Sequence, residues 1–346
     1  MAKCARRLYA VLMSCALGVA PTAWSLDVLR MGSFPIGGEV ISRHDLPVRE
    51  VSVPGANFTM KVDPNGDYFV DQLYVQYVKL RHPRSKYPLI LIHGGGMTAS
   101  TWEDTPDGRP GWQTYFLDKG YDVYMIDSVG RGRAGMSSAQ LQTGEPIYPT
   151  AQGTWALARI GPPGSYNTDP AKRVGFPGVK FPLAAFDTLM RERVPSRGSA
   201  EAAATAKALS SLIQRICPCV LIAHSSGGPY ALEAAVQYPD KIKAVVAIEP
   251  AGAPDPSKEA ATGNVKSVPH LFLWGDFLGG DPIQQKAMPP VRAWSAALAG
   301  AGGVSEWVEL PKHGITGNTH VMMMDSNSDV ISGLVQEWFV RHGMMR

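Results

Sequence analysis

The sequence predicts a doubly wound α/β fold built on a mostly parallel sheet. Short apolar runs recur along the chain, and most are followed by a glycine-containing turn and then a helical stretch. These runs are apolar throughout, which is typical of strands buried on both faces, as in a parallel sheet. Alternation of such strands with helices indicates one sheet covered by helices on both sides. The 346 residues suit one large domain of this kind with insertions.

The elements follow in chain order. The N-terminal part is β-rich, and residues 68–80 form a strand in which Leu73, Val75 and Tyr77 alternate onto one face. Further strands are predicted at residues 88–92, 122–126, 220–223, 243–248, 270–274 and 304–310. Helices are predicted at residues 199–216, 230–238, 293–298 and 330–341.

Residues 134–198 interrupt this alternation. The segment is rich in Pro and Gly and holds only short helical patches, such as residues 186–193. Because long irregular segments within a compact domain are usually functional loops, we expect it to form a lid or cap over a site.

Residues 1–25 have the features of an export signal. Lys3, Arg6 and Arg7 precede an apolar stretch, and Ala23-Trp-Ser25 fits a small-x-small cleavage site. We therefore expect a mature domain of residues 26–346 in the periplasm or outside the cell. The formal net charge of +3 falls to about zero without this segment. The mature chain thus has no basic surplus that would favour nucleic acid or an anionic membrane as a partner.

Cysteine use predicts no metal site. Cys4 and Cys15 lie in the signal segment, which leaves Cys217 and Cys219 just before a strand. Either a disulfide across one residue or two buried thiols is compatible with this spacing in an exported chain. Two cysteines without a neighbouring ligand pair do not make a zinc site.

Ser225 is the candidate nucleophile. It lies at the centre of Ala223-His-Ser-Ser-Gly227, directly after an apolar run. A small-x-Ser-x-Gly turn between a strand and a helix holds its serine above the sheet, where Oγ is free to react. Read without function, the same pattern is a tight corner rich in small residues.

Glycines after another strand predict an oxyanion hole. His93-Gly-Gly-Gly96 follows the strand at residues 88–92, and glycine lets backbone N–H groups approach a substrate. We expect the N–H groups of Gly95 and Ser226 to bind the oxyanion, with Gly96 as the alternative to Gly95. No Lys-Ser or Lys-Thr follows the glycines, so phosphate binding is not indicated.

Two histidines compete for the role of base. His313 and His320 both lie between the last strand and the last helix, where the order Ser, acid, His places the base. The apolar residues 321–324 could wall a dry site and favour His320, but position leaves both open.

Two carboxylates compete for the role of acid. Glu249 follows the strand at residues 243–248, and Asp276 follows the next strand, which is the commoner place. Spacing does not decide between them. Asp127 precedes a Gly-rich turn and is expected to fix it, while His93 and His224 lie within turns and are expected to be structural.

Several longer motifs resemble those of exported bacterial carboxylesterases of the α/β-hydrolase fold whose triad acid is a glutamate. This group includes the esterase that de-esterifies sulfonylurea herbicides. The resemblance rests on His93-Gly-Gly-Gly-Met-Thr-Ala-Ser-Thr-Trp102, Thr105-Pro-Asp-Gly-Arg109, Ile248-Glu-Pro250 and Gly317-Asn-Thr-His320, and it covers most of the mature chain.

The resemblance implies a serine carboxylesterase with Ser225 as nucleophile, His320 as base and Glu249 as acid. It also implies a small-molecule ester substrate, no cofactor and a homodimer. The same scaffold can act on lactones, polyesters or carbon–carbon bonds, or bind a ligand without catalysis, because fold does not fix function.

Overall fold

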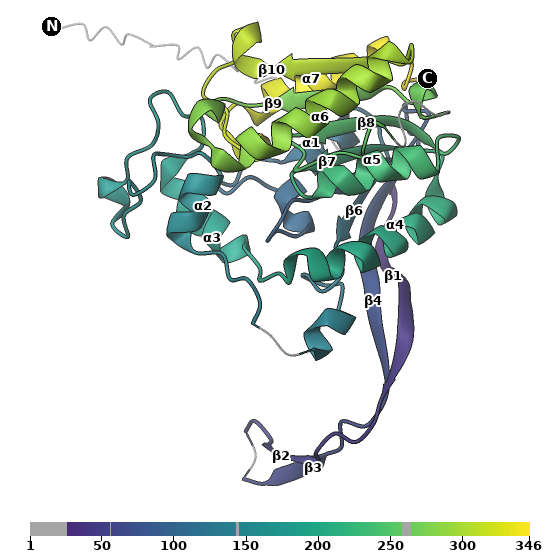
Figure 1. The fold of residues 1–346 in the computed structure, drawn as a ribbon, viewed down its shortest axis with the longest axis vertical. Coiled ribbons are helices and arrows are strands. Elements are labelled where there is room, and N and C mark those ends of the chain that lie inside the picture. Colours follow the sequence, from purple (N-terminus) through teal and green to yellow (C-terminus); the bar gives the residue numbers. More distant parts are fainter. Residues whose placement is uncertain (1–25, 56, 143–144, 258–263) are drawn as a thin grey trace, which may run out of the picture.

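The computed structural model describes residues 26–55, 57–142, 145–257 and 264–346, so the predicted signal segment at residues 1–25 lies outside the described residues. An eight-stranded sheet forms the centre of the molecule, with the order β1-β4-β6-β5-β7-β8-β9-β10 (Figure 1). β1 and β4 are antiparallel at one edge, and the pairs from β6 to β10 are parallel. The strands of this sheet are Val28–Arg43 (β1), Gly66–Leu80 (β4), Leu89–Ile92 (β5), Val123–Asp127 (β6), Cys219–His224 (β7), Ile242–Ile248 (β8), His270–Trp274 (β9) and Ser305–Glu309 (β10). The predicted α/β fold with a mostly parallel sheet is confirmed.

Helices cover both faces of the sheet and enclose two apolar cores. In β5, the buried Leu89 and Leu91 belong to one core, while the buried Ile90 and Ile92 belong to the other. The first core contains side chains of α1 and α7, and the second contains side chains of α4, α5 and α6. The helices are Trp112–Asp118 (α1), Ala151–Leu157 (α2), Phe186–Glu192 (α3), Ala202–Ile216 (α4), Gly227–Gln237 (α5), Pro282–Gly300 (α6) and Ser328–Arg341 (α7). This two-sided burial is the reason why the central strands, from β5 to β9 along the chain, are largely apolar.

Helix α6 differs most from its predicted extent. Helix α6 begins at Pro282, well before the predicted residues 293–298, and contains Pro289 and Pro290 in its interior. Proline removes a backbone donor and usually ends a helix, so the sequence pattern did not predict the first half of α6 as helical. Asp281 caps that half, since its Oδ1 accepts hydrogen bonds from the N–H groups of Ile283 and Gln284 at 2.9 and 3.2 Å.

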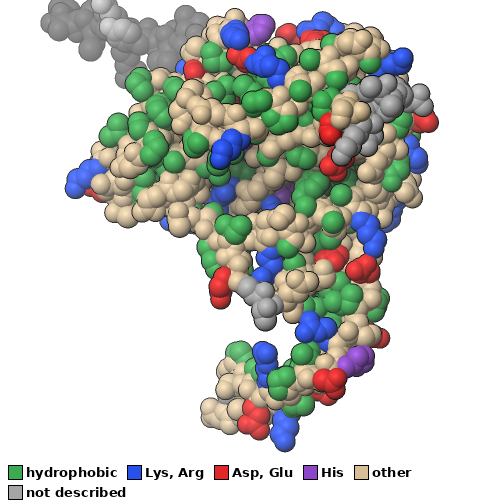
Figure 2. Space-filling view, viewed as in Figure 1, with side chains coloured by type: hydrophobic (Ala, Val, Ile, Leu, Met, Phe, Trp, Pro, Cys, Tyr) green, Lys and Arg blue, Asp and Glu red, His purple; other side chains and the backbone are tan. Residues whose placement is uncertain are grey.

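A β-hairpin arm extends from the antiparallel edge of the sheet (Figure 1). It consists of the outer ends of β1 and β4 with the strands Arg49–Ser52 (β2) and Thr59–Val62 (β3), which pair at its tip. Apolar side chains such as Phe58 and Phe69 are exposed on it. Figure 2 shows that hydrophobic and charged side chains are interleaved along its visible face.

The segment of residues 134–198 holds α2 and α3 and packs onto the body of the domain. Its buried Trp155, Phe186 and Leu189 belong to the same apolar core as α1 and α7. Cys217 and Cys219 form a disulfide bond at the start of β7. In the described part of the chain, no helix is both long and apolar enough to cross a membrane.

A buried histidine at the start of β9 predicts acid-sensitive folding. Burial lowers the pKa of His270 to about 4, although its Nδ1–H donates to the Val268 carbonyl at 2.7 Å. Below pH ~6.5 the unfolded chain binds a proton that the folded chain excludes, so stability should fall as the pH drops from about 6.5 to about 4. Asparagine does not titrate in this range, so His270→Asn should reduce the change in the free energy of unfolding with pH. Urea unfolding at a series of pH values measures this change.

The exposed His44 provides a matched control, because His44→Asn changes an imidazole that solvent already reaches. An unchanged slope in His270→Asn, or an equal change in both variants, would contradict the role of burial.

Candidate active site

The turn at Ser225 has the strained backbone expected of an exposed nucleophile. Ser225 has a φ of 51°, in the left-handed region that non-glycine residues rarely adopt. It lies between the end of β7 and Gly227, the first residue of α5. Its N–H donates to Ile248 at 2.9 Å, and its carbonyl accepts from Gly228 and Ala251, each at 2.9 Å. The turn is thus fixed to β8 at the carboxyl edge of the parallel sheet, where open α/β sheets bind ligands.

Of the two candidate histidines, His320 reaches Ser225. Its Nε2 lies 3.0 Å from Ser225 Oγ, and its backbone N–H donates to the Ala158 carbonyl at 2.9 Å. His313 is exposed at the end of the short helix Leu310–His313.

The loop that carries His320 is held by a buried carboxylate. Asp325 accepts hydrogen bonds from Thr319 N–H and Oγ at 2.8 Å and from Asn318 Nδ2 at 3.0 Å. Burial raises the pKa of Asp325 to about 7. Arg109 in turn donates to the backbone carbonyl of Asp325 at 2.9 Å. The restrictive Thr-Pro-Asp-Gly-Arg motif therefore supports the histidine loop from outside the site.

Of the two candidate carboxylates, Glu249 reaches His320. Glu249 is fully buried, and its Oε2 lies 2.5 Å from His320 Nδ1. Because an ionised carboxylate only accepts, Nδ1 carries the proton and Nε2 is left to accept from Ser225. Asp276 instead accepts from the N–H groups of Phe277 and Gly317 at 2.7 and 2.9 Å, which anchors the start of the histidine loop.

A buried arginine binds the far side of Glu249. Arg159 Nη1 donates to Glu249 Oε2 at 2.8 Å, and its Nη2 donates to Oε1. Gly275 N–H also donates to Oε1 at 2.7 Å. Burial alone would raise the pKa of Glu249, but the charge of Arg159 and the hydrogen bond from His320 outweigh it and lower the pKa to about 2.

The loop of Gly94, Gly95 and Gly96 lies against Ser225. A Cβ on Gly94 would lie 2.6 Å from His224 Nδ1 and 3.1 Å from Ser225 Cβ, so a side chain does not fit there. Arg193 donates to the Gly95 carbonyl, and the Val194 N–H donates to the Gly96 carbonyl, both at 3.0 Å. With these carbonyls turned toward Arg193 and Val194, the loop can present backbone N–H groups to the site.

The remaining candidates have structural contacts. Asp127 accepts from the Ala99 N–H at 2.7 Å and from the Arg133 N–H at 2.9 Å, which fixes the turn after β6 as predicted. His224 Nε2 donates to the His320 carbonyl at 2.8 Å, and His93 Nε2 accepts from a backbone N–H. Burial lowers the pKa of both imidazoles, so both are neutral near pH 7.

A small cavity of about 60 Å³ opens beside Ser225. Its apolar walls come from both the segment of residues 134–198 and the rest of the domain: Met97, Leu157, Ala158, Leu189 and Val321. Gly95, Arg193 and His320 also line it. Among the described residues, no group of three His, Cys, Asp or Glu side chains is arranged to hold a metal ion.

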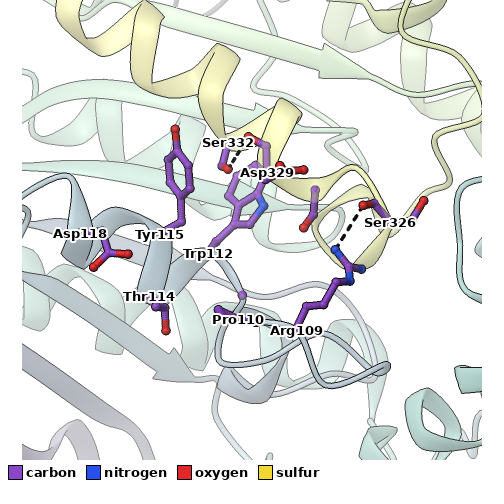
Figure 3. A pocket seen from close by; sticks show the side chains of 11 residues that line it. Arg109, Pro110, Trp112, Thr114, Tyr115, Asp118, Ser326, Asp329 and Ser332 are labelled. Carbon is purple, nitrogen blue, oxygen red and sulfur yellow. Dashed lines mark hydrogen bonds between the residues drawn. The ribbon is translucent and has the colours of Figure 1, made fainter. Parts of the chain in front are cut away.

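A larger pocket of about 360 Å³ lies elsewhere, between α1 and the start of α7. Figure 3 shows Arg109 in it, pointing toward Ser326, with Trp112 and Tyr115 nearby. Neither Ser225 nor His320 lines this pocket, so we place the candidate site at the smaller cavity, where the reactive groups converge.

Sequence reasoning missed Arg159, Arg193 and Asp325. Arg159 and Arg193 lie in the irregular segment of residues 134–198, where no periodicity assigns a side chain to a face. A spacing signal existed only for Asp325, because it follows Gly317-Asn-Thr-His320 closely enough to close a turn.

Gly275 allows Glu249 to reach His320. A Cβ on Gly275 would lie 2.9 Å from Glu249 Oε1 and 2.7 Å from the Asn318 carbonyl. Gly275→Ala should therefore displace the carboxylate and destabilise the fold by about 1–3 kcal/mol through overpacking. Urea unfolding measures the stability, and the low-field proton NMR signal of His320 Nδ1–H reports its bond to Glu249.

Gly279→Ala is the matched control, since its Cβ would meet nothing within 4 Å. Retention of the low-field signal in Gly275→Ala would show that the carboxylate does not depend on this space.

Comparison with known proteins agrees with the fold. Residues 89–344 match the model of the alpha/beta hydrolase family. A solved structure described as a novel bacterial esterase is 32% identical, covers 92% of this chain and 98% of its own, and superposes with a TM-score of 0.78. A probable secreted lipase, phiG, from a fungal species (strain ATCC 74256) is 28% identical over 86% of this chain and 93% of its own length. The chain belongs to the alpha/beta hydrolase family and is of the esterase and lipase type.

Proposed function

We propose that this chain is an exported serine carboxylesterase that hydrolyses small carboxylic esters through an acyl-enzyme intermediate. The observation that carries the proposal is the line of hydrogen bonds from Ser225 Oγ to His320 Nε2 and from His320 Nδ1 to Glu249 Oε2, at 3.0 and 2.5 Å. A nucleophile, a base and an orienting acid in this order suit acyl transfer, and none of these steps needs a metal or an organic cofactor.

Acylation begins at Ser225. Its Oγ attacks the ester carbonyl carbon while His320 Nε2 takes the hydroxyl proton. Glu249 holds the imidazole in the required tautomer and stabilises the imidazolium that forms. His320 then gives the proton to the alcohol oxygen as the carbon–oxygen bond breaks, which leaves the acyl group on Ser225.

The backbone N–H groups of Gly95 and Ser226 bind the developing oxyanion. Gly95 and Ser225 line the same cavity, and Ser226 directly precedes α5, whose N-terminal end favours negative charge. Water, activated by His320, then attacks the acyl carbon and returns Ser225 to its free form.

The cavity supports small substrates. Its volume of about 60 Å³ is several times the roughly 10–15 Å³ that a cavity needs to hold one water molecule, so it accommodates a group of a few atoms. The apolar walls suit a short alkyl group rather than a charged one.

Likeness to a bacterial esterase and to a probable secreted lipase supports both ester hydrolysis and export. The sequence motifs further support a place in the exported group with a glutamate acid. The homodimer stays a prediction that analytical ultracentrifugation of the mature chain would test.

Replacement of the nucleophile tests the proposal. Ser225→Ala should lower turnover of p-nitrophenyl acetate and butyrate by at least about 10³-fold, because no other group forms the acyl-enzyme. Its unfolding midpoint should stay close to that of the wild type. A fluorophosphonate probe should label the wild type and not the variant.

Ser226→Ala is the matched control, because it removes a neighbouring hydroxyl and keeps the backbone N–H. Undiminished hydrolysis by Ser225→Ala would refute the mechanism, and a wild type that neither reacts nor takes the label would favour a non-catalytic ligand-binding protein.

Comparison of the two carboxylates tests the acid. Glu249→Gln should lower kcat by roughly 10²–10⁴-fold, because the amide no longer stabilises the imidazolium. Asp276→Asn, a change of the same kind one strand away, should cost less than about tenfold, because it affects only the hydrogen bonds that anchor the loop. The measurement is kcat of the two variants at the same pH. A larger loss of kcat in Asp276→Asn would assign the role of acid to Asp276.

A further inference from the structure

Arg159 is a buried charge that the proposed mechanism does not yet use. Its side chain is 2% exposed, and its backbone has a φ of 55°, which is strained for a non-glycine residue. It follows α2 in the cap, yet its guanidinium reaches the ends of two central strands. Beyond Glu249, its Nε donates to the Asp276 carbonyl at 2.8 Å, and its Nη1 lies 3.3 Å from Asp281 Oδ2.

Arg159 completes the hydrogen bonding of the Glu249 carboxylate. Oε2 accepts from His320 Nδ1 and Arg159 Nη1, and Oε1 accepts from Gly275 N–H and Arg159 Nη2. Two parallel bonds from a planar guanidinium define the plane of a carboxylate, which a single ammonium does not. The two bonds from Arg159 therefore orient the carboxylate so that Oε2 faces the imidazole of His320.

Asp281 balances the charge of Arg159. Arg159 alone would cancel the charge of Glu249 and weaken its attraction for an imidazolium. With Asp281 included, the buried group carries one net negative charge, which becomes zero when His320 is protonated. Asp281 is itself held at the start of α6 by the N–H groups of Ile283 and Gln284.

We propose that Arg159, balanced by Asp281, is a positioning residue that orients Glu249 toward His320 and tunes how readily His320 accepts a proton. The inference rests on the proposed esterase function. The adjoining Leu157 and Ala158 line the cavity beside Ser225, so one short cap segment contacts both the substrate space and the acid.

The charges around His320 give this role a signature in the pH profile. Glu249 and Asp281 favour the imidazolium, whereas Arg159 opposes it. Further titratable or charged groups in the described surroundings of His320 and Glu249 are His224, with its ring centroid 4.6 Å from that of His320, Arg193, Asp325 and Asp276. These four groups are the same in every variant compared, so they do not account for shifts in opposite directions.

The experiment compares four variants of the mature enzyme by the pH dependence of kcat/KM for p-nitrophenyl butyrate. Arg159→Gln should move the acidic limb to higher pH by about half a unit or more, and Asp281→Asn should move it to lower pH. The double variant Arg159→Gln/Asp281→Asn should return the limb close to that of the wild type. Arg159→Lys should leave the acidic limb of the pH profile in place but lower kcat, because lysine keeps the positive charge and loses the two parallel hydrogen bonds.

In Arg159→Gln, kcat should fall by about 10–100-fold with KM within about twofold, because the substrate-binding walls are unchanged. Arg173→Gln is the matched control: it removes another buried cap arginine, paired with Asp187 at 2.6 Å, and should lower stability without moving the pH profile. Asp281→Asn keeps a residue that caps helices well, so a folded variant is available even where Arg159→Gln unfolds.

Superimposed pH profiles, or shifts in the same direction for Arg159→Gln and Asp281→Asn, would overturn the inference and leave a purely structural ion cluster. Fluorophosphonate labelling separates the two proposals. If the wild type hydrolyses the ester and is labelled at Ser225 while the profiles coincide, only the role of Arg159 fails. If the wild type neither reacts nor is labelled, the esterase proposal and this inference fail together.

Discussion

The ionised carboxylate of Glu249 is the interaction on which the rest of the site depends. It is fully buried and accepts four hydrogen bonds, from His320, Gly275 and both terminal nitrogens of Arg159. A buried charge with one partner removed typically costs about 3–5 kcal/mol, so the groups around it are under strong constraint. Three constrained features lie around this one charge: the left-handed backbone of Glu249, with a φ of 42°, the left-handed backbone of Arg159 and the narrow space at Gly275.

This constraint also changes how the segment of residues 134–198 is understood. A mobile lid would need to separate from the site, but in this segment Arg159 donates to Glu249 and the Ala158 carbonyl accepts from the His320 N–H. Lys180 adds two backbone hydrogen bonds to the histidine loop, from its N–H to Gly317 and from Ser326 to its carbonyl. The apolar side chains of the segment of residues 134–198 share a core with α1 and α7. These contacts join the segment and the edge of the sheet at Ser225 into one packed unit.

Sequence patterns predicted the fold well because its signal is local. Each central strand is an apolar run bounded by turn residues, and burial on both faces leaves that pattern unambiguous. The turn at Ser225 is local in the same sense. The choices between His313 and His320, and between Glu249 and Asp276, were not local, because they depend on which side chains meet across strand ends. Motif resemblance indicated His320 and Glu249, and the geometry brings the same two residues to Ser225. Arg159 was beyond either approach, since it acts across 90 residues of sequence from a segment without periodicity.

The proposed acid, Glu249, lies one strand earlier than usual, and the hydrogen bonds at the edge of the sheet account for this position. Asp276, at the commoner position, points its carboxylate to the N–H of Gly317 and so fixes the start of the histidine loop. Glu249 has one more methylene than an aspartate, and its carboxylate passes over Gly275, where a side chain would block it. In that position one side of the carboxylate meets His320 and the other remains open to the guanidinium of Arg159. An acid on the next strand would have to satisfy the loop and the imidazole together. The two-carboxylate arrangement separates these tasks, and it explains why a longer acid, a glycine on the neighbouring strand and a buried arginine occur together.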